Sequence, residues 1–189
     1  GGMGRRSVDN EIYILQSRRL MEEVVKRYDL STAYSTSGRI RTVDIYGRTP
    51  LLVKFLTAAP SDAGSFKYTV KKDGKVALGE FRDRLGEEQS FKTTATVGDT
   101  ITTPLGKIVF MPTPYVDQYI DKKVNVSKYP LNEITESYRK RLQCNITDKM
   151  TSVINITMSD VVPKRAEDVI NGIIEAYNAD AIQINVIKR

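Results

Sequence analysis

The spacing of the apolar residues changes twice along the chain, and this change limits the possible folds more than any other feature. Near both ends, apolar residues recur at intervals of three and four, which is typical of amphipathic helices. From residue 39 to about residue 126, apolar and polar residues alternate instead, as in strands with one covered face. Because strands follow strands without helices between them, the pattern favours an α+β fold with a mainly antiparallel or mixed sheet.

Three helices are expected. The first spans about residues 9–28, with Asp9 as its N-cap. The second spans residues 130–142. The third runs from Pro163, which suits a first helical turn, to about Ala181. The first and last of these helices are expected to cover a common sheet made largely of the last third of the chain, with a β-rich insertion in the middle.

The strands are expected to be short, and residues 32–38 before them are expected to form a loop. Asp73 and Gly74 separate two alternating runs, which predicts a hairpin because a tight primed turn requires positive φ. The expected strands lie near residues 43–45, 51–56, 66–71, 76–78, 93–97, 107–111, 122–127, 143–147 and 151–158.

The composition argues against most enzyme chemistry. The chain has no His and a single Cys, Cys144, so it lacks His-based triads, His zinc ligands and any intrachain disulfide. It also lacks a Walker-type phosphate loop and a nucleophile elbow. Cys144 alternates with Ile146 in an expected strand, which favours a buried structural thiol. We therefore expect no catalytic, cofactor-binding or metal-binding residues.

The charge is moderately basic. Lys and Arg number 29 and Asp and Glu number 23, which gives +6 over 189 residues. This excess is smaller than a dedicated nucleic-acid-binding domain usually carries, so no nucleic-acid partner is expected. Two interpretations of the basic clusters remain open. They are either solvated faces of the protein or contacts to an anionic surface such as lipid headgroups or an acidic glycan.

Two segments resemble a known family. Residues 10–30 read NEIYILQSRRLMEEVVKRYDL, and residues 150–177 read MTSVINITMSDVVPKRAEDVINGIIEAY. The first resembles the segment that opens the extracytoplasmic domain of Wzz-type chain-length determinants, or polysaccharide co-polymerases. The second is similar to the strand–Asp–Pro–helix unit of that family. Among its members, the chain looks most like the transmembrane (Wzc-like) tyrosine kinases of capsule and exopolysaccharide export.

The resemblance implies a domain plan and a role. Residues 1–8 would be a linker that includes a cloning remnant, residues 9–47 and 115–189 a Wzz-like α/β core, and residues 48–114 a β-rich insertion. The domain would be non-catalytic and lie on the periplasmic side of the bacterial inner membrane. It would be anchored by segments outside this chain, and any ATP-dependent tyrosine kinase domain would be a separate cytoplasmic part of the parent protein.

The family forms homo-oligomers that act with the polysaccharide polymerase and export machinery. By this resemblance, the expected face for oligomer or partner contacts comprises Ser17, Arg18, Arg19, Glu22, Asn171 and Tyr177. The family extends its last helix as a long arm, whereas residues 182–186 alternate here, so we expect the helix to end before them. The two chain ends are expected to emerge near each other.

One alternative function remains open on the residues themselves. A small binding module could grip an acidic polysaccharide through a basic β surface. Its expected contacts are Arg39, Arg41, Lys54, Lys67 and Lys71.

Overall fold

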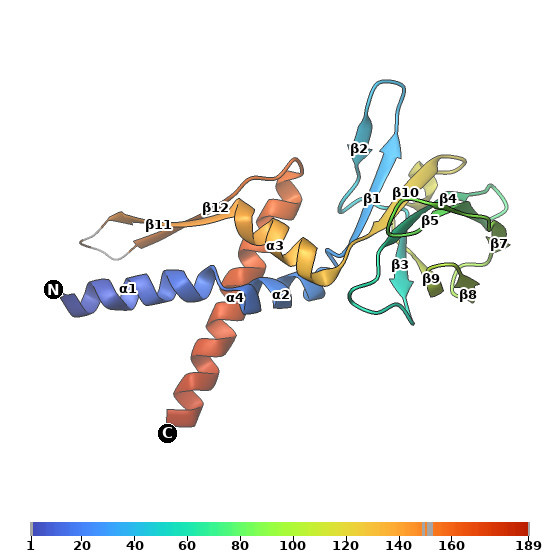
Figure 1. Ribbon diagram of the computed structural model, residues 1–189. Helices are drawn as coiled ribbons and strands as arrows, with labels where there is room; N and C mark the ends of the chain where they lie inside the picture. The colour runs from blue at the N-terminus through green and yellow to red at the C-terminus, as the bar shows by residue number, and fades with distance from the viewer. Residues whose placement is uncertain (1, 149, 151–152, 189) are drawn as a thin grey trace. The chain divides into compact units, whose positions relative to one another are not determined.

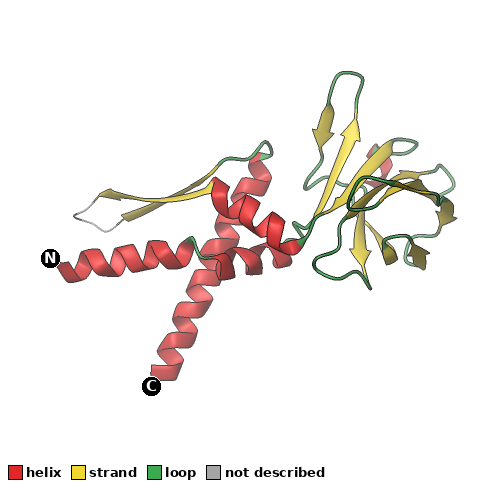
Figure 2. Cartoon of the chain, in the orientation of Figure 1, coloured by secondary structure: helices red, strands yellow, loops and turns green. Residues whose placement is uncertain are grey.

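The computed structural model describes residues 2–148, 150 and 153–188. Within this part of the chain it has four α-helices, a short 3-10 helix and twelve strands, and every strand pair is antiparallel. The expected α+β class is therefore confirmed (Figure 1). Ten of the twelve strands follow one another with no α-helix between them, and the last two form a hairpin between the third and fourth α-helices. Figure 2 distinguishes the helices and strands by colour.

The chain forms two compact units. Residues 1–30 and 131–189 form one, which we call the helical unit, and residues 31–130 form the other, the β-rich unit. The expected insertion, residues 48–114, is thus shorter than the observed β-rich unit. Residues 31–47 and 115–130 belong to that unit because they contribute strands to its largest sheet.

The first expected helix is two helices, α1 (Gly2–Leu15) and α2 (Arg18–Arg27). Ser17 separates them with an extended backbone, φ −70° and ψ 151°, and its hydroxyl accepts a hydrogen bond from the Leu20 N–H at 3.4 Å. This side-chain cap begins a new helix. Asp9 lies inside α1 instead of capping it, and α1 also takes in residues 2–8, which we expected to be linker.

The rest of the helical unit contains α3 (Leu131–Arg141), the hairpin strands β11 (Leu142–Asp148) and β12 (Val153–Met158), and α4 (Pro163–Lys188). The second helix and both strands lie where the sequence places them. The end of α4 differs, because the helix continues through residues 182–186. Extending an existing helix adds one hydrogen bond per residue, whereas a new strand needs a partner.

Helix α2 packs against both α3 and α4 in the helical unit. Its apolar stripe is fully buried and consists of Leu20, Met21, Val24 and Val25. Gly172 of α4 allows the close approach, since a Cβ there would lie 2.9 Å from the Tyr28 ring and 3.1 Å from a Val24 methyl. The β11–β12 hairpin contacts α1, α3 and α4. The two resembling segments therefore meet in one unit, but the sheet beside them has only two strands.

The β-rich unit holds ten strands and the 3-10 helix η1. Their bounds are β1 Thr32–Ser37, β2 Thr42–Asp44, β3 Leu51–Phe55, β4 Gly64–Val70, β5 Val76–Arg82, β6 Glu88–Gln89, β7 Thr93–Ala95, β8 Thr100–Thr103, β9 Gly106–Pro112, η1 Val116–Gln118 and β10 Lys123–Lys128. One sheet has the order β2-β1-β10-β4-β5-β6, with β7 also pairing with β5, and a second sheet has the order β3-β9-β8. Residues 32–37 form a strand instead of the expected loop because β10 and β2 pair with them on both sides.

The core of the β-rich unit lies between these two sheets. Phe66 and Phe81 stack with their ring centroids 4.8 Å apart, and Phe110 from the smaller sheet packs edge-on against Tyr68 at 5.3 Å. Two buried phenols also join the sheets by hydrogen bonds. The Tyr68 hydroxyl donates to the Leu51 carbonyl at 2.8 Å and accepts from the Leu51 N–H at 3.1 Å, and the Tyr34 hydroxyl accepts from the Val53 N–H at 2.8 Å.

Candidate functional site

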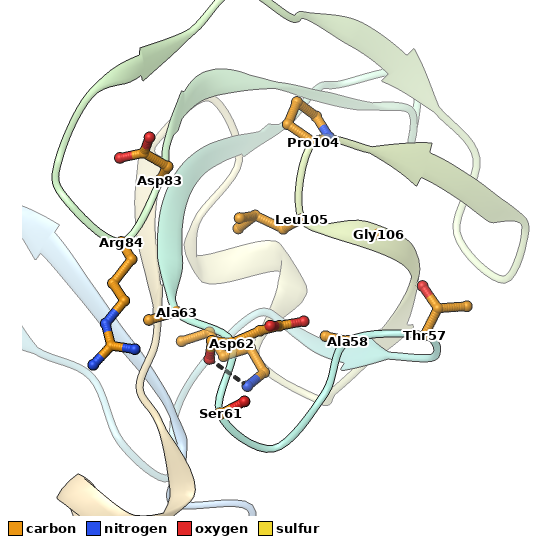
Figure 3. Close-up of a pocket in the computed structure, with 11 residues that line it drawn as sticks. Thr57, Ala58, Ser61, Asp62, Ala63, Asp83, Arg84, Pro104, Leu105 and Gly106 are labelled. Atoms are coloured by element: carbon orange, nitrogen blue, oxygen red, sulfur yellow. Dashed lines mark hydrogen bonds between the residues drawn. The ribbon is translucent and has the colours of Figure 1, made fainter.

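The first hollow of the β-rich unit has a volume of about 460 Å³ (Figure 3). Its polar groups largely hold its own walls together. Lys128 Nζ donates to the carbonyls of Ala59 at 3.2 Å and Asp62 at 2.7 Å. One Asp83 oxygen accepts the N–H groups of Leu85 and Glu87, each at 2.9 Å. Leu105 points into the remaining space, which Ser61, Asp62 and Arg84 also line (Figure 3).

The second hollow is an open groove of about 510 Å³ on the outer face of β4, β5, β7 and β10. We call it the lysine groove. Its lining residues are Lys67, Thr69, Ala77, Leu78, Gly79, Glu80, Lys92, Thr93, Thr94 and Lys123. Three lysines thus reach it from three separate segments: β4, the residue before β7, and the start of β10.

Strand alternation places these side chains on the outer face. In β4, Phe66 and Tyr68 are buried in the core, so Lys67 and Thr69 between and beside them point outward. The antiparallel register then sets Lys123 of β10 opposite Thr69, and Asn125 opposite Lys67. The polar surface is therefore a direct product of the period-two pattern.

A β-bulge in β5 brings a carboxylate to the lysines. Two residues of β5, Glu80 and Phe81, lie opposite the single Phe66 of β4, because the register shifts between Ser65 and Lys67. Glu80 has φ 54°, an unusual left-handed conformation for a residue other than glycine. Bulges of this kind redirect a side chain, and strained backbone is concentrated at functional sites.

Glu80 links two of the three lysines. Its carboxylate accepts a hydrogen bond from Lys123 Nζ at 2.7 Å and pairs with Lys67 Nζ at 3.5 Å. The hydrogen bond from Lys123, followed by the charges of both lysines, lowers the pKa of Glu80 despite some desolvation. Both ammonium groups remain open to solvent, since the Lys67 side chain is 39% exposed and the Lys123 side chain 58% exposed.

The groove has the chemistry of an anion-binding surface. Three lysines and one glutamate give it a formal charge of +2, and three threonines add hydroxyl groups. None of its lining residues is aromatic. Across the part of the chain that the structure describes, no group of three or more Asp, Glu, Cys or His side chains is placed to hold a metal ion.

The structure separates the five expected glycan contacts. Lys67 lines the groove, and Lys71 follows the end of β4. Arg39 and Arg41 lie in the turn between β1 and β2, while Lys54 lies in β3 of the smaller sheet. The sequence analysis missed Lys92 and Lys123. The outward position of Lys123 in an alternating strand was the available signal for it.

The expected assembly residues on α2 largely make contacts within the helical unit. Arg18 donates to the side chains of Asn132 and Glu136 on α3, the latter at 3.5 Å. Arg19 pairs with Glu23 at 3.4 Å and with Asp180 of α4 at 2.5 Å, and this Asp180 contact raises the pKa of Arg19.

The remaining assembly candidates divide into bonded and exposed residues. Ser17 is the cap of α2, and Glu22 pairs with Lys26 at 3.6 Å. Burial and a hydrogen bond to Glu11 of α1 raise the pKa of the Tyr177 phenol. Asn171 lies on the exposed side of α4.

Sequence reasoning assigned no structural role to Asp160 of the second resembling segment, which fixes the start of α4. Its buried carboxylate accepts two hydrogen bonds from Arg165 at 2.8 Å, one from Arg141 at 3.2 Å and one from the Val162 N–H at 2.8 Å. Burial alone would raise its pKa, but the bonds from Arg165 and Val162 and the two positive charges outweigh burial, and the pKa is lowered. Cys144 is buried, and burial raises the pKa of its thiol, which fits a structural role.

Comparison with known proteins does not identify the chain. No protein-family model matches it, and no curated protein matches it significantly. No helix among the described residues has both the length and the apolar character needed to cross a bilayer.

Proposed function

We propose that this chain is the non-catalytic extracytoplasmic domain of a membrane-anchored, tyrosine-kinase-linked polysaccharide co-polymerase. In the full-length protein it oligomerises, acts with the polymerase and export machinery on the periplasmic side of the bacterial inner membrane, and regulates the chain length or export of capsular polysaccharide or exopolysaccharide. The motif resemblance of residues 10–30 and 150–177 is the starting point for this proposal.

One structural observation carries the proposal. The two resembling segments lie far apart in the sequence, yet they supply α2 and α4, which pack against each other in one unit. Arg19 bonds to Asp180 across this contact, and Arg27 bonds to Glu175 at 2.5 Å. The packing of the two resembling segments against each other supports the proposal.

The exposed side of α4 is the best place to test assembly. Asn171 and the neighbouring Ile174 are both solvent-exposed there, and Ile174 is among the exposed large apolar side chains of the protein. In contrast, charge reversal of Arg18 or Arg19 would also break contacts within the unit, so its effect on assembly would be confounded with a loss of stability.

The test is N171R in the full-length protein, expressed in cells that lack the wild-type protein. We expect a shifted polysaccharide length distribution on gels and a smaller oligomer by native mass measurement, with an unchanged melting temperature of the isolated domain. The control is K54E, a charge change at an exposed position of β3 in the β-rich unit. An unaltered length distribution and oligomer in a folded N171R protein would contradict the proposal.

A further inference from the structure

We propose that the lysine groove binds an acidic polysaccharide, that is, a polymer whose sugars carry carboxylate groups. This inference concerns a different surface from the assembly role of α4 and does not depend on it. It also replaces the broader basic surface expected from the sequence with a defined site built around Lys67, Lys92 and Lys123.

Two of the three cations of the groove, Lys67 and Lys123, are paired with one carboxylate. Glu80 contacts Lys123 at 2.7 Å and Lys67 at 3.5 Å, so a single carboxylate keeps both ammonium groups at one point of the sheet. Lys92 approaches from the other side, where Gly79 makes room for it: a Cβ on Gly79 would lie 3.2 Å from the Lys92 Cβ. Positioning side chains before binding reduces the entropy lost when a ligand orders them.

Glu80 also indicates what kind of group the lysines accept. A carboxylate already pairs with two of them in the free protein, at 2.7 Å from Lys123 and 3.5 Å from Lys67. A carboxylate on a ligand can make the same contacts in place of Glu80 or beside it, with the lysines donating charge-assisted hydrogen bonds. The carboxylate of an acidic sugar matches this geometry directly.

The polar surface extends beyond the lysines, and this favours a polymer over a small anion. Asn125 lies opposite Lys67, and its amide donates to Ser35 at 3.2 Å and to Ser37 at 3.0 Å. Thr69, Thr93 and Thr94 continue the surface in the other direction. Adjacent strands are about 4.8 Å apart, which is comparable to the length of one sugar ring, so successive sugars crossing the strands would each meet polar side chains.

The same surface is poorly suited to nucleic acid. Single strands are bound by stacking their bases on aromatic side chains, and no aromatic residue lines the groove. Duplexes require many phosphate contacts, whereas the groove has three lysines offset by Glu80. An acidic polysaccharide needs fewer charge contacts than a duplex, and the hydroxyls of Thr69, Thr93 and Thr94 can bond to sugar hydroxyls.

Binding is tested with the purified chain and two probes: polygalacturonate, which carries carboxylates, and dextran, which is neutral. We expect affinity electrophoresis to show retardation by polygalacturonate that weakens with added salt, and none by dextran. The variant K67Q/K123Q is expected to lose about tenfold in affinity, the scale for removing two charge contacts.

The matched control is K54Q/K107Q, which removes the same charge from exposed positions in the smaller sheet. We expect its affinity to stay within about twofold of wild type, and circular dichroism verifies that both double variants fold. An equal loss in both would show general charge attraction and overturn the proposal. So would no binding to polygalacturonate at low salt, or tighter binding to a single-stranded DNA of matched charge. None of these outcomes bears on the N171R test.

Discussion

At the scale of single residues, Asp160 gives the clearest prediction for the stability of the helical unit. Its carboxylate is fully buried between Arg165 and Arg141. The variant D160N leaves both guanidinium groups without their anion, so we expect the free energy of unfolding to fall by about 3 kcal/mol, as for removal of one partner of a buried ion pair. Urea denaturation followed by helical circular dichroism measures this change.

The contribution of Asp160 must also depend on pH. Its pKa in the folded protein lies below the ordinary value. The stabilisation is therefore complete above the unfolded pKa, about 3.9, and is lost as the pH falls through the folded pKa. The stability gap between wild type and D160N should close over that acidic range. The control E23Q removes an exposed partner of Arg19 and should cost less than about 0.5 kcal/mol. A gap that stays constant with pH would contradict this interpretation.

The sequence predicts which residues are buried better than it predicts which side chains pair with one another. The alternation of Cys144 with Ile146 predicted a thiol facing inward, and Cys144 is indeed buried. The same logic predicted outward Lys67, which lies in the groove. In contrast, the pairing of Asp160 with Arg141 links the loop before α4 to the end of α3. It cannot be inferred from spacing, because it depends on how the elements pack.

At the scale of secondary-structure elements, the break between α1 and α2 depends on Ser17. Its hydroxyl satisfies the Leu20 N–H, which would otherwise lack a partner at the start of α2. We expect S17A to lower the free energy of unfolding by about 1 kcal/mol and S17D to retain it, since Asp is an equally good N-cap. If S17A and S17D are equally destabilised in urea denaturation, Ser17 is not acting as a cap.

A second prediction concerns how β3 is attached to the larger sheet. The Tyr68 hydroxyl takes both the N–H and the carbonyl of Leu51, which is fully buried. The variant Y68F leaves both groups unpaired, so we expect a loss of about 2 kcal/mol. Y34F leaves only the Val53 N–H unpaired and should cost less.

The matched control for these phenols is Y129F, at a largely exposed tyrosine, which should change stability by less than about 0.5 kcal/mol. Guanidinium denaturation followed by far-ultraviolet circular dichroism compares the three variants. A loss for Y68F no larger than that for Y129F would show that the Leu51 groups find other partners.

Most helices and strands were predictable from the sequence, but not all of their first and last residues were. The helices 130–142 and from 163 onward, and most strands, lie where hydrophobic period placed them. Two errors share a cause. Residues 32–37 form β1 only because distant β10 pairs with them, and the expected first helix is split by a side-chain cap that leaves the apolar spacing unchanged. Hydrophobic period carries neither piece of information, since a distant strand sets the first and the Ser17 side chain sets the second.

At the scale of the whole molecule, the β-rich unit has the organisation of an inserted domain. Its buried apolar cluster draws only on residues between 34 and 126. Its ends also meet, because Thr32 pairs with Lys128 in the β1–β10 ladder and the Tyr129 N–H donates to the Ser31 carbonyl at 2.8 Å. The sequence predicted an insertion but placed its borders at residues 48 and 114, since the closing β1–β10 pair joins residues that are far apart in the chain.

Because the ends meet, each unit should fold without the other. We expect residues 31–130 expressed alone to show a β-type circular dichroism spectrum and a cooperative unfolding transition, since the fragment retains the complete apolar cluster. We also expect a chain in which a short Gly-Ser linker joins Leu30 to Leu131 to be helical, because opposed residues in an antiparallel pair lie about 5 Å apart. Y68F should shift the unfolding transition of residues 31–130. D160N should change only the spectrum of the chain in which Leu30 is joined to Leu131.

Because the units can be separated, each of the two proposals can be tested on its own protein. The linked helical unit should retain the contacts that N171R is designed to disrupt, and the isolated β-rich unit should retain the binding of polygalacturonate that K67Q/K123Q weakens. If residues 31–130 fold but do not bind while the whole chain does, the binding surface includes the helical unit and the lysine groove alone is insufficient. If residues 31–130 fail to fold, the closed β1–β10 ladder does not define an independent domain. The two units would then depend on each other for stability.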